Sequence, residues 1–399
     1  MRVILVVAAA VTLVAFGEAR GEPVETRSPN GRDQKPAFSG QTRAPKPEKA
    51  SQVQTEKVAS GLDHPWALEF LPDGRMLVTE KKGQLRIVDA KGQLSKPVSG
   101  LPKVVDDGQG GLLDVALDPN HSSNGLIYWS YSEPRKGGNG TAVARGRLVT
   151  QGQPRVEKVQ VIFRQQPTFE SDKHFGSRLV FTPDGMLFIV LGERSLPESR
   201  VKSQDLGTHF GKVIRINPDG SVPKDNPFVG RAGAQPEIWS YGHRNIQSAA
   251  LDSQGRLWTV EHGPKGGDEL NRPQPGKNYG WPVITYGIDY SGKPIGQGIT
   301  AQEGMEQPLY YWDPVIGPSG MAFYSGDRFP EWRGNMLLGG LVSEGIVRLV
   351  LDGDRVASEE WIPLDARIRD VKVGPDGAVY AITDEGDGRI LRVLPAQGK

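Results

Sequence analysis

A histidine, a cation and an amide lie in polar, glycine-rich segments where they could do chemistry. His174 follows Asp172 by two residues, and histidine is the side chain whose ordinary pKa suits a general base near neutral pH. A loop histidine without a catalytic role explains the same spacing about as well. Arg244 and Asn245 place a guanidinium beside an amide. This pair could polarise a carbonyl or hold an anion, or it could simply bond neighbouring loops.

Two further groups suit the binding of an anion or a metal. Arg367 and Arg369 are separated by one residue, so in an extended strand both side chains lie on one face. That face would suit a polyanion, or it would face solvent. Glu261, Asp268 and Glu269 lie among Gly and Pro residues, as do the oxygen ligands of many calcium loops, although their spacing is not that of the helix–loop–helix calcium motif. The chain has no Cys, so oxygen or imidazole would hold any metal.

A repeat runs through the elements that must position these residues. It consists of an apolar run, a turn and a second apolar run. Four copies are clear and two are looser: residues 67–78, 179–189, 249–259 and 371–381, then those that begin at 115 and 321. Several turns read Pro-Asp-Gly, which predicts β-hairpins because Pro presets the first turn residue and Gly accepts a positive φ.

The number and length of the copies predict the architecture. Six copies in the domain give about 58 residues each, enough for a four-stranded blade with functional loops. We therefore expect an all-β protein, a six-bladed β-propeller with functional loops at one face of the central channel. Two stacked β-sandwiches are less favoured, since they would not produce one repeat throughout the chain.

The chain divides into three segments. Residues 1–19 read as a signal peptide, with an apolar run from Val3 to Phe16 and a small residue at Ala19. An uncleaved membrane anchor is less favoured because charged residues follow at once. Residues 20–50 are rich in Pro, Lys, Arg and Gln, which predicts a disordered Pro-rich linker. Residues 51–396 form the predicted propeller domain, and the protein is expected in the periplasm or outside the cell.

The charge balance limits the classes of partner. Lys and Arg number 48 against 47 Asp and Glu, a formal net charge of +1. A nucleic-acid-binding domain usually shows a clear excess of positive charge. We therefore expect no nucleic-acid partner. Stable insertion in a membrane is not expected either, because the N-terminal apolar run is too short to span a bilayer comfortably. The sequence does not fix the oligomeric state, and a monomer is favoured.

Nine short segments carry a resemblance to a known family. They are Gly108-Gln-Gly-Gly-Leu-Leu113, His174-Phe-Gly-Ser-Arg178, Gly211-Lys-Val-Ile-Arg-Ile216, Pro223-Lys-Asp-Asn-Pro-Phe228, Gly242-His-Arg-Asn245, Glu261-His-Gly-Pro264, Asn278-Tyr-Gly-Trp-Pro282, Pro318-Ser-Gly-Met-Ala-Phe323 and Arg367-Ile-Arg-Asp370. Together, in this order, they resemble the soluble pyrroloquinoline quinone-dependent aldose sugar dehydrogenases, relatives of soluble quinoprotein glucose dehydrogenase. The resemblance covers residues 55 to 393.

The resemblance implies a catalytic group and a cofactor site. His174 matches the general base that takes the proton of the sugar's anomeric hydroxyl while hydride passes to the quinone. Arg244 and Asn245 match the groups that bind and polarise the quinone carbonyls, and Gln109 matches a glutamine on the substrate side. The clamps on the cofactor carboxylates match Arg367 and Arg369.

The resemblance also implies calcium. Gly263 and Pro264 match backbone carbonyls that bind the calcium ion beneath the quinone. Asp268, Glu269 and Tyr279 fall where the family carries a second, structural calcium site. The expected activity is thus oxidation of aldose sugars at C1 to lactones, with electrons passed to an acceptor that the sequence does not identify.

Two positions depart from the family pattern, and two other functions stay open. Many members carry a cofactor-binding lysine in the strand before Gly345, whereas residues 340–344 here contain none and Val342 lies at their centre. Glu193 replaces a more usual Asp.

Two other functions are compatible with the sequence. A calcium-dependent propeller lactonase would need carboxylates converging on one channel calcium. A non-catalytic ligand-binding propeller would explain the missing lysine.

Overall fold

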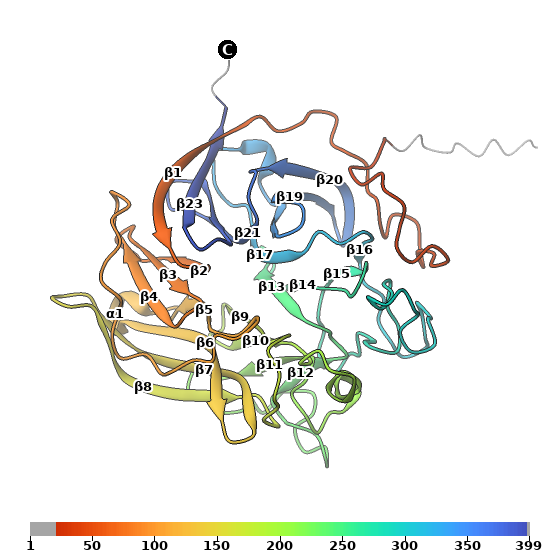
Figure 1. Cartoon of the computed structure of the whole chain (residues 1–399), viewed down its shortest axis with the longest axis horizontal. Coiled ribbons are helices and arrows are strands. Elements are labelled where there is room, and N and C mark those ends of the chain that lie inside the picture. Colours follow the sequence, from red (N-terminus) through yellow and green to blue (C-terminus); the bar gives the residue numbers. More distant parts are fainter. Residues whose placement is uncertain (1–20, 397–399) are drawn as a thin grey trace, which may run out of the picture.

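Six antiparallel β-sheets surround one axis in the computed structural model, which describes residues 21–396 (Figure 1). Each sheet is one blade, so the predicted six-bladed propeller is confirmed. The predicted signal peptide, residues 1–19, lies outside the described residues.

The blades follow one another along the chain. The first has three strands, β2 (Pro65–Phe70), β3 (Met76–Glu80) and β4 (Gln84–Val88). The second has β5 (Leu112–Leu117), β6 (Leu126–Arg135), β7 (Gly138–Val149) and β8 (Arg155–Arg164). The third has β9 (Gly176–Phe181), β10 (Leu187–Leu191), β11 (Lys212–Ile216) and β12 (Ile238–Tyr241).

The other three blades complete the circle. The fourth contains β13 (Ile246–Leu251), β14 (Leu257–Glu261), β15 (Asp268–Asn271) and β16 (Tyr310–Trp312). The fifth contains β17 (Pro318–Phe323), β18 (Met336–Gly340), β19 (Gly345–Asp352) and β20 (Arg355–Pro363). The sixth contains β21 (Ile368–Val373), β22 (Val379–Thr383) and β23 (Gly388–Pro395), with β1 (Val53–Leu62) as its outer strand.

The sixth blade joins the two ends of the domain. Strand β1 pairs antiparallel with β23, with Val53 opposite Pro395 and Lys57 opposite Leu391. The first and last strands therefore close the ring by backbone hydrogen bonds, which leaves no open gap between blades.

The repeated turns connect the two innermost strands of each blade. In the first blade, Leu71 and Arg75 bracket the turn through a hydrogen bond of 2.8 Å, and Gly74 has φ +85°. This left-handed conformation favours glycine, which explains why the turns keep Gly in the third position. The hairpins expected from Pro-Asp-Gly are thus present.

The apolar core lies between blades. Six clusters of buried residues each join two neighbouring sheets; the one between the first and second blades includes Leu77, Val115 and Trp129. Because each sheet buries both faces against its neighbours, burial of apolar side chains around the ring stabilises the whole domain.

A buried ion cluster crosses the propeller axis below the functional face. Arg178 lies 2.9 Å from Asp114 and 3.3 Å from Asp370, measured between side-chain nitrogen and oxygen atoms. Its guanidinium carbon lies 4.5 Å from the ring centre of Trp66. These contacts tie the innermost strands of four blades together and support the floor of the channel.

Residues 21–50 differ from the predicted disordered linker. They form no long strand, but Pro23 bridges Pro45, and Gln41 and Ala44 are buried against the fourth blade. The composition predicted disorder because aliphatic residues are scarce. The segment is held instead by polar side chains that bond backbone groups of the propeller. The expectation of disorder is therefore wrong for this segment.

Helices are few and short in the described chain. They are α1 (His121–Asn124), α2 (Pro197–Arg200) and the 3₁₀ turns η1 (Val201–Gln204) and η2 (Pro330–Trp332). None of the helices within residues 21–396 has the length and apolar character needed to cross a membrane.

Candidate active site

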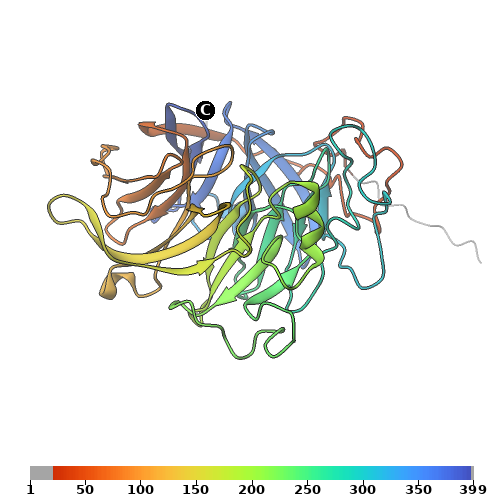
Figure 2. The same ribbon diagram turned by 60° about the horizontal axis from the view of Figure 1, so that its bottom comes forward.

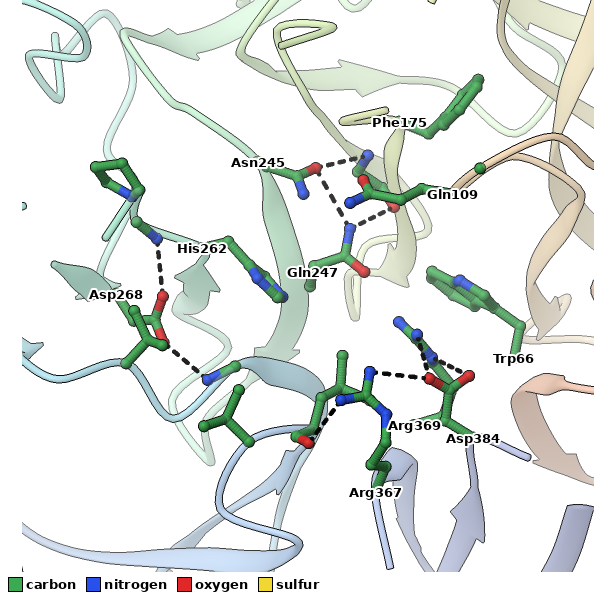
Figure 3. Close-up of a pocket in the computed structure, with 18 of the residues that line it drawn as sticks. Trp66, Gln109, Phe175, Asn245, Gln247, His262, Asp268, Arg367, Arg369 and Asp384 are labelled. Atoms are coloured by element: carbon green, nitrogen blue, oxygen red, sulfur yellow. Dashed lines mark hydrogen bonds and ion pairs between the residues drawn. The ribbon is translucent and has the colours of Figure 1, made fainter. Parts of the chain in front are cut away.

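A cavity of about 500 Å³ opens at one end of the propeller axis. Residues from all six blades, or from the loops just before their innermost strands, line it. One from each blade in order is Trp66, Gln109, Phe175, Asn245, Gly317 and Arg369. The loops that lead into the innermost strands all reach this face, so residues far apart in the sequence meet around one cavity (Figure 3).

One wall of the cavity is a cluster of amides. The Asn245 side-chain oxygen accepts hydrogen bonds from the Gly176 backbone N–H at 3.2 Å and from Gln247 Nε2 at 3.4 Å. Gln109 Oε1 accepts the backbone N–H of His174 at 2.9 Å. These bonds fix Asn245 and Gln109 in orientation (Figure 3), and the cluster offers donors and acceptors to a polar ligand.

His174 lies next to this wall and just outside the cavity lining. Its backbone has φ +51°, a strained conformation for a residue with a Cβ. Its Nδ1 lies 3.1 Å from Oε1 of Glu193, and the side chain is 7% exposed. Burial, together with the nearby charge of Arg244, lowers the pKa of His174 below its usual 6.5. The imidazole is therefore neutral at neutral pH, as a general base must be.

Arg244 lies behind the same wall, in a small cavity that shares His262 and Gly263 with the main one. Its Nη1 donates to the His262 carbonyl at 2.9 Å, and its guanidinium carbon is 5.2 Å from the ring centre of Trp281. Its Nε is buried and has no hydrogen-bond partner within residues 21–396. The cation thus keeps a free donor beside the cavity.

The opposite wall carries two cations and one carboxylate. Arg367 donates to the Leu341 carbonyl at 3.0 Å and lies 3.3 Å from Asp384. Arg369 lies 3.0 Å from the same carboxylate. Burial alone would raise the pKa of Asp384, but the two guanidiniums outweigh it and lower that pKa. With Asp384 ionised, this wall has one surplus positive charge and favours an anion.

Residues 263–268 form a tight loop at the side of the cavity, with Gly263, Pro264 and Asp268 among the lining residues. Asp268 organises this loop: its carboxylate accepts the Gly263 N–H at 2.8 Å and the N–H groups of Ile316 and Gly317 at 2.9 Å each. Burial raises the pKa of Asp268 to about 7 despite these bonds.

Glu269 does not line the main cavity, and it shares the small cavity of Arg244 with a second carboxylate, Glu261. Burial and the neighbouring Glu261 raise the pKa of Glu269 well above its ordinary value. The Oδ1 of Asn271, which lies beside both, has no hydrogen-bond partner in the described part of the chain. Tyr279 is linked to this pair of carboxylates through His243. The Tyr279 ring stacks on the His243 ring, and Nδ1 of His243 lies 2.9 Å from Oε1 of Glu261.

Sequence reasoning missed several lining residues. His262 lines the cavity and donates from Nε2 to the Pro318 carbonyl at 2.6 Å, and burial lowers its pKa to about 3. Its position beside Gly263 was the available signal. No sequence motif marks Trp66, Gln247 or Asn30 as a cavity-lining residue. Asn30 comes from the segment predicted to be disordered, so no pattern could have placed it there.

Comparisons with known proteins identify relatives over most of the chain. The family described as Glucose / Sorbosone dehydrogenase matches residues 62–392. An aldose sugar dehydrogenase of Escherichia coli is 46% identical over 351 residues, 86% of this chain and 93% of that protein.

Two solved structures extend the comparison. The crystal structure of a glucose dehydrogenase has a TM-score of 0.83 and 47% identity, and covers 86% of this chain and 100% of its own. The PQQ-bound form of an aldose sugar dehydrogenase from Streptomyces coelicolor has a TM-score of 0.71 and 29% identity, and covers 86% of this chain and 98% of its own.

Proposed function

The chain belongs to the Glucose / Sorbosone dehydrogenase family, and on that premise we propose that it oxidises aldose sugars at C1 to lactones. It is a pyrroloquinoline quinone-dependent aldose dehydrogenase by family and by its relatives. The assignments of the base and the metal rest on the contacts described above, and export rests on the N-terminal sequence.

The cavity fits the quinone. Pyrroloquinoline quinone carries three carboxylates, and the wall formed by Arg367, Arg369 and Asp384 has surplus positive charge for one of them. The buried Nε of Arg244 has no hydrogen-bond partner among residues 21–396, and Asn245 is held in orientation by Gly176. We assign Arg244 and Asn245 to the quinone carbonyls and the two other arginines to its carboxylates. The quinone, when bound, supplies a two-electron hydride acceptor.

His174 is assigned as the base because of its placement. Its Nδ1 faces Glu193, so Nε2 is the nitrogen left to accept the proton of the anomeric hydroxyl. Loss of that proton and of hydride from C1 together leaves the lactone, which balances atoms and charge. Gln109 ties its side chain to the His174 backbone and lines the cavity, so we place it on the sugar side. The observation that carries this function is that the amide wall and the arginine wall face one cavity, with His174 just behind the lining and bonded through its backbone N–H to the lining residue Gln109.

Two calcium sites belong to the proposal. The carbonyls of Gly263 and Pro264, in the loop that Asp268 organises, would hold the ion at the cavity, where calcium supplies a Lewis acid. The second site rests on Glu269, whose ionisation is disfavoured by the negative charge of Glu261. It also rests on the Asn271 Oδ1, which has no hydrogen-bond partner in the part of the chain that the structure describes. A cation between these groups would relieve the repulsion. Asp268 and Tyr279 flank the second site.

Reconstitution tests this function. Adding pyrroloquinoline quinone and calcium to purified apoprotein should produce bound-quinone absorbance and dye-coupled oxidation of glucose. A lactonase would instead hydrolyse lactones with calcium alone. Within residues 21–396 the cavity carboxylates do not converge, because Asp268 is bonded to backbone N–H groups and Asp384 to arginines. Quinone binding without sugar oxidation would favour the non-catalytic propeller.

Val342 allows a prediction about the missing lysine. It lines the cavity next to Leu341, whose carbonyl bonds Arg367, and it is 50% exposed. Val342→Lys would place a cation near the quinone carboxylates and should tighten quinone binding. The gain should be only roughly fivefold, about 1 kcal/mol, because solvent screens a half-exposed cation. Titration of apoprotein with quinone measures this. Val342→Met is the matched control without charge, and equal affinities for the two variants would contradict the prediction.

Export is part of the same proposal. The apolar run from Val3 to Phe16 and the small residue Ala19 support a cleaved signal peptide, with residues 51–396 as the catalytic domain. Mass spectrometry of the mature protein should find an N-terminus near Arg20. An intact Met1 in a membrane fraction would contradict export.

A further inference from the structure

The segment before the propeller is built onto the fourth blade. We define residues 22–46 as the N-terminal strap. It lies beside β16 and the loop at residues 280–300, as both views show (Figures 1 and 2). The strap precedes the family match, which begins at residue 62. The shared family pattern therefore says nothing about it.

Polar anchors fix the strap at its base. Lys46 N–H donates to the Glu22 carbonyl at 2.9 Å, which closes the strap into a loop. The Arg43 guanidinium donates to the carbonyls of Glu25 and Arg27, both at 2.6 Å, and to that of Asp313 at 2.8 Å. A single side chain thus joins both arms of the strap to the blade.

A second anchor is fully buried. Gln41 donates from Nε2 to the Pro308 carbonyl at 2.8 Å, and its own carbonyl accepts the Tyr311 N–H at 2.9 Å. Ala44 packs into the apolar cluster between the fourth and fifth blades. These contacts hold residues 41–44 of the strap against the fourth blade.

The tip of the strap, Asn30 and Gly31, donates hydrogen bonds to the buried carboxylate of Asp313. Asp313 accepts the Asn30 N–H at 2.9 Å, the Asn30 Nδ2 at 2.7 Å and the Gly31 N–H at 2.8 Å. Asp313 is 4% exposed, so these three donors replace the water that an ionised carboxylate requires. The strap therefore supplies three hydrogen bonds to the Asp313 carboxylate.

Asp313 in turn lies against the loop at residues 263–268. A Cβ added to Gly266 would lie 2.4 Å from Asp313 Oδ1, which shows how closely the two pack. The next residue, Gly267, donates its N–H to the Trp312 carbonyl at 2.8 Å. Asn30 and Gly266 both line the main cavity. The contacts run without a gap from the strap to the cavity wall.

We propose that the N-terminal strap is a working part of the active site, and that Asn30 is a positioning residue for the loop at residues 263–268. By holding Asp313, it keeps the Gly263 and Pro264 carbonyls in place for the cofactor and its cation. This inference rests on the proposed function for what the loop binds, while the mechanical coupling from strap to loop rests on the contacts alone.

Asn30→Asp tests the coupling with an isosteric change. It places a second carboxylate on Asp313, which repels the tip of the strap. We expect the Gly263 and Gly267 amides to exchange hydrogen at least tenfold faster in apoprotein, and the quinone dissociation constant to rise at least fivefold. Asn30→Ala, which removes one donor, should act in the same direction with a smaller effect. Lys35→Ala, at an exposed position of the strap, should change neither quantity.

The double variant Asn30→Asp with Asp313→Asn separates positioning from general damage. It removes the repulsion and should restore both amide exchange and quinone affinity toward the wild-type values. Unchanged exchange in Asn30→Asp, or no recovery in the double variant, would overturn the proposal. Wild-type protein that binds no quinone would overturn the proposed function instead, and amide exchange would still decide whether the strap supports the loop.

Discussion

His174→Ala is expected to slow sugar oxidation by roughly 10²–10⁴-fold, the usual worth of a general base, while quinone binding and the fold stay intact. Hydride leaves an anomeric carbon readily only as the hydroxyl proton is withdrawn. The loss should therefore appear in the reductive half-reaction, measured by stopped flow as slow bleaching of bound oxidised quinone by sugar. Unlike an alanine at a cofactor-binding arginine, this variant should keep the wild-type dissociation constant for the quinone.

The pH dependence of the same step gives the control. Burial and Arg244 lower the pKa of His174 below 6.5, so activity should fall only as pH drops below that value and the imidazole gains a proton. Glu193 acts in the opposite sense and raises this pKa. Glu193→Gln should therefore move the acid limb to still lower pH, because it removes the negative charge and keeps an acceptor oxygen for the ring. Near-normal bleaching in His174→Ala would remove His174 from the mechanism. An acid limb at the same pH in Glu193→Gln as in the wild type would do the same.

The sequence predicted the scaffold because its signals are local. Each Pro-Asp-Gly turn specifies a hairpin between residues close in the chain, and six copies specify a ring of blades. The polar segments before the innermost strands had to meet at one face once that ring closed. Residue type and spacing marked Asn245 and Arg369 as candidates, whereas only the resemblance to the family placed Gln109 at the same site.

The parts that escaped prediction depend on contacts between distant residues. Glu193 was noted only as a departure, and its proximity to His174 follows from how β9 and β10 pair. Asn30 lies in a segment whose composition predicts disorder. Its order comes from Arg43 and Gln41, which bond backbone groups of the fourth blade. Composition measures the apolar area that a segment could bury, and it does not register polar side chains that fit acceptors elsewhere.

Exhaustive removal of calcium is expected to abolish dehydrogenase activity, and calcium should restore it. The loop at residues 263–268 offers carbonyl oxygens, which suit calcium. Magnesium demands a smaller octahedral shell and keeps its waters, so it should restore little. Dye-coupled glucose oxidation after dialysis against chelator, followed by titration with each metal, measures both effects. Full activity after exhaustive dialysis would contradict the assignment.

Glu269→Gln distinguishes the two proposed calcium sites. A ligand that binds only the folded state stabilises it by about 2.7 kcal/mol at a concentration one hundredfold above its dissociation constant, so calcium should raise the Tm of the wild-type apoprotein. The variant removes one charge of the pair formed by Glu261 and Glu269. It should gain less Tm from calcium yet still need calcium for turnover, because Gly263 and Pro264 keep their carbonyls. If it instead lost the calcium dependence of turnover and kept the rise in Tm, Glu269 would belong to the site at the cavity.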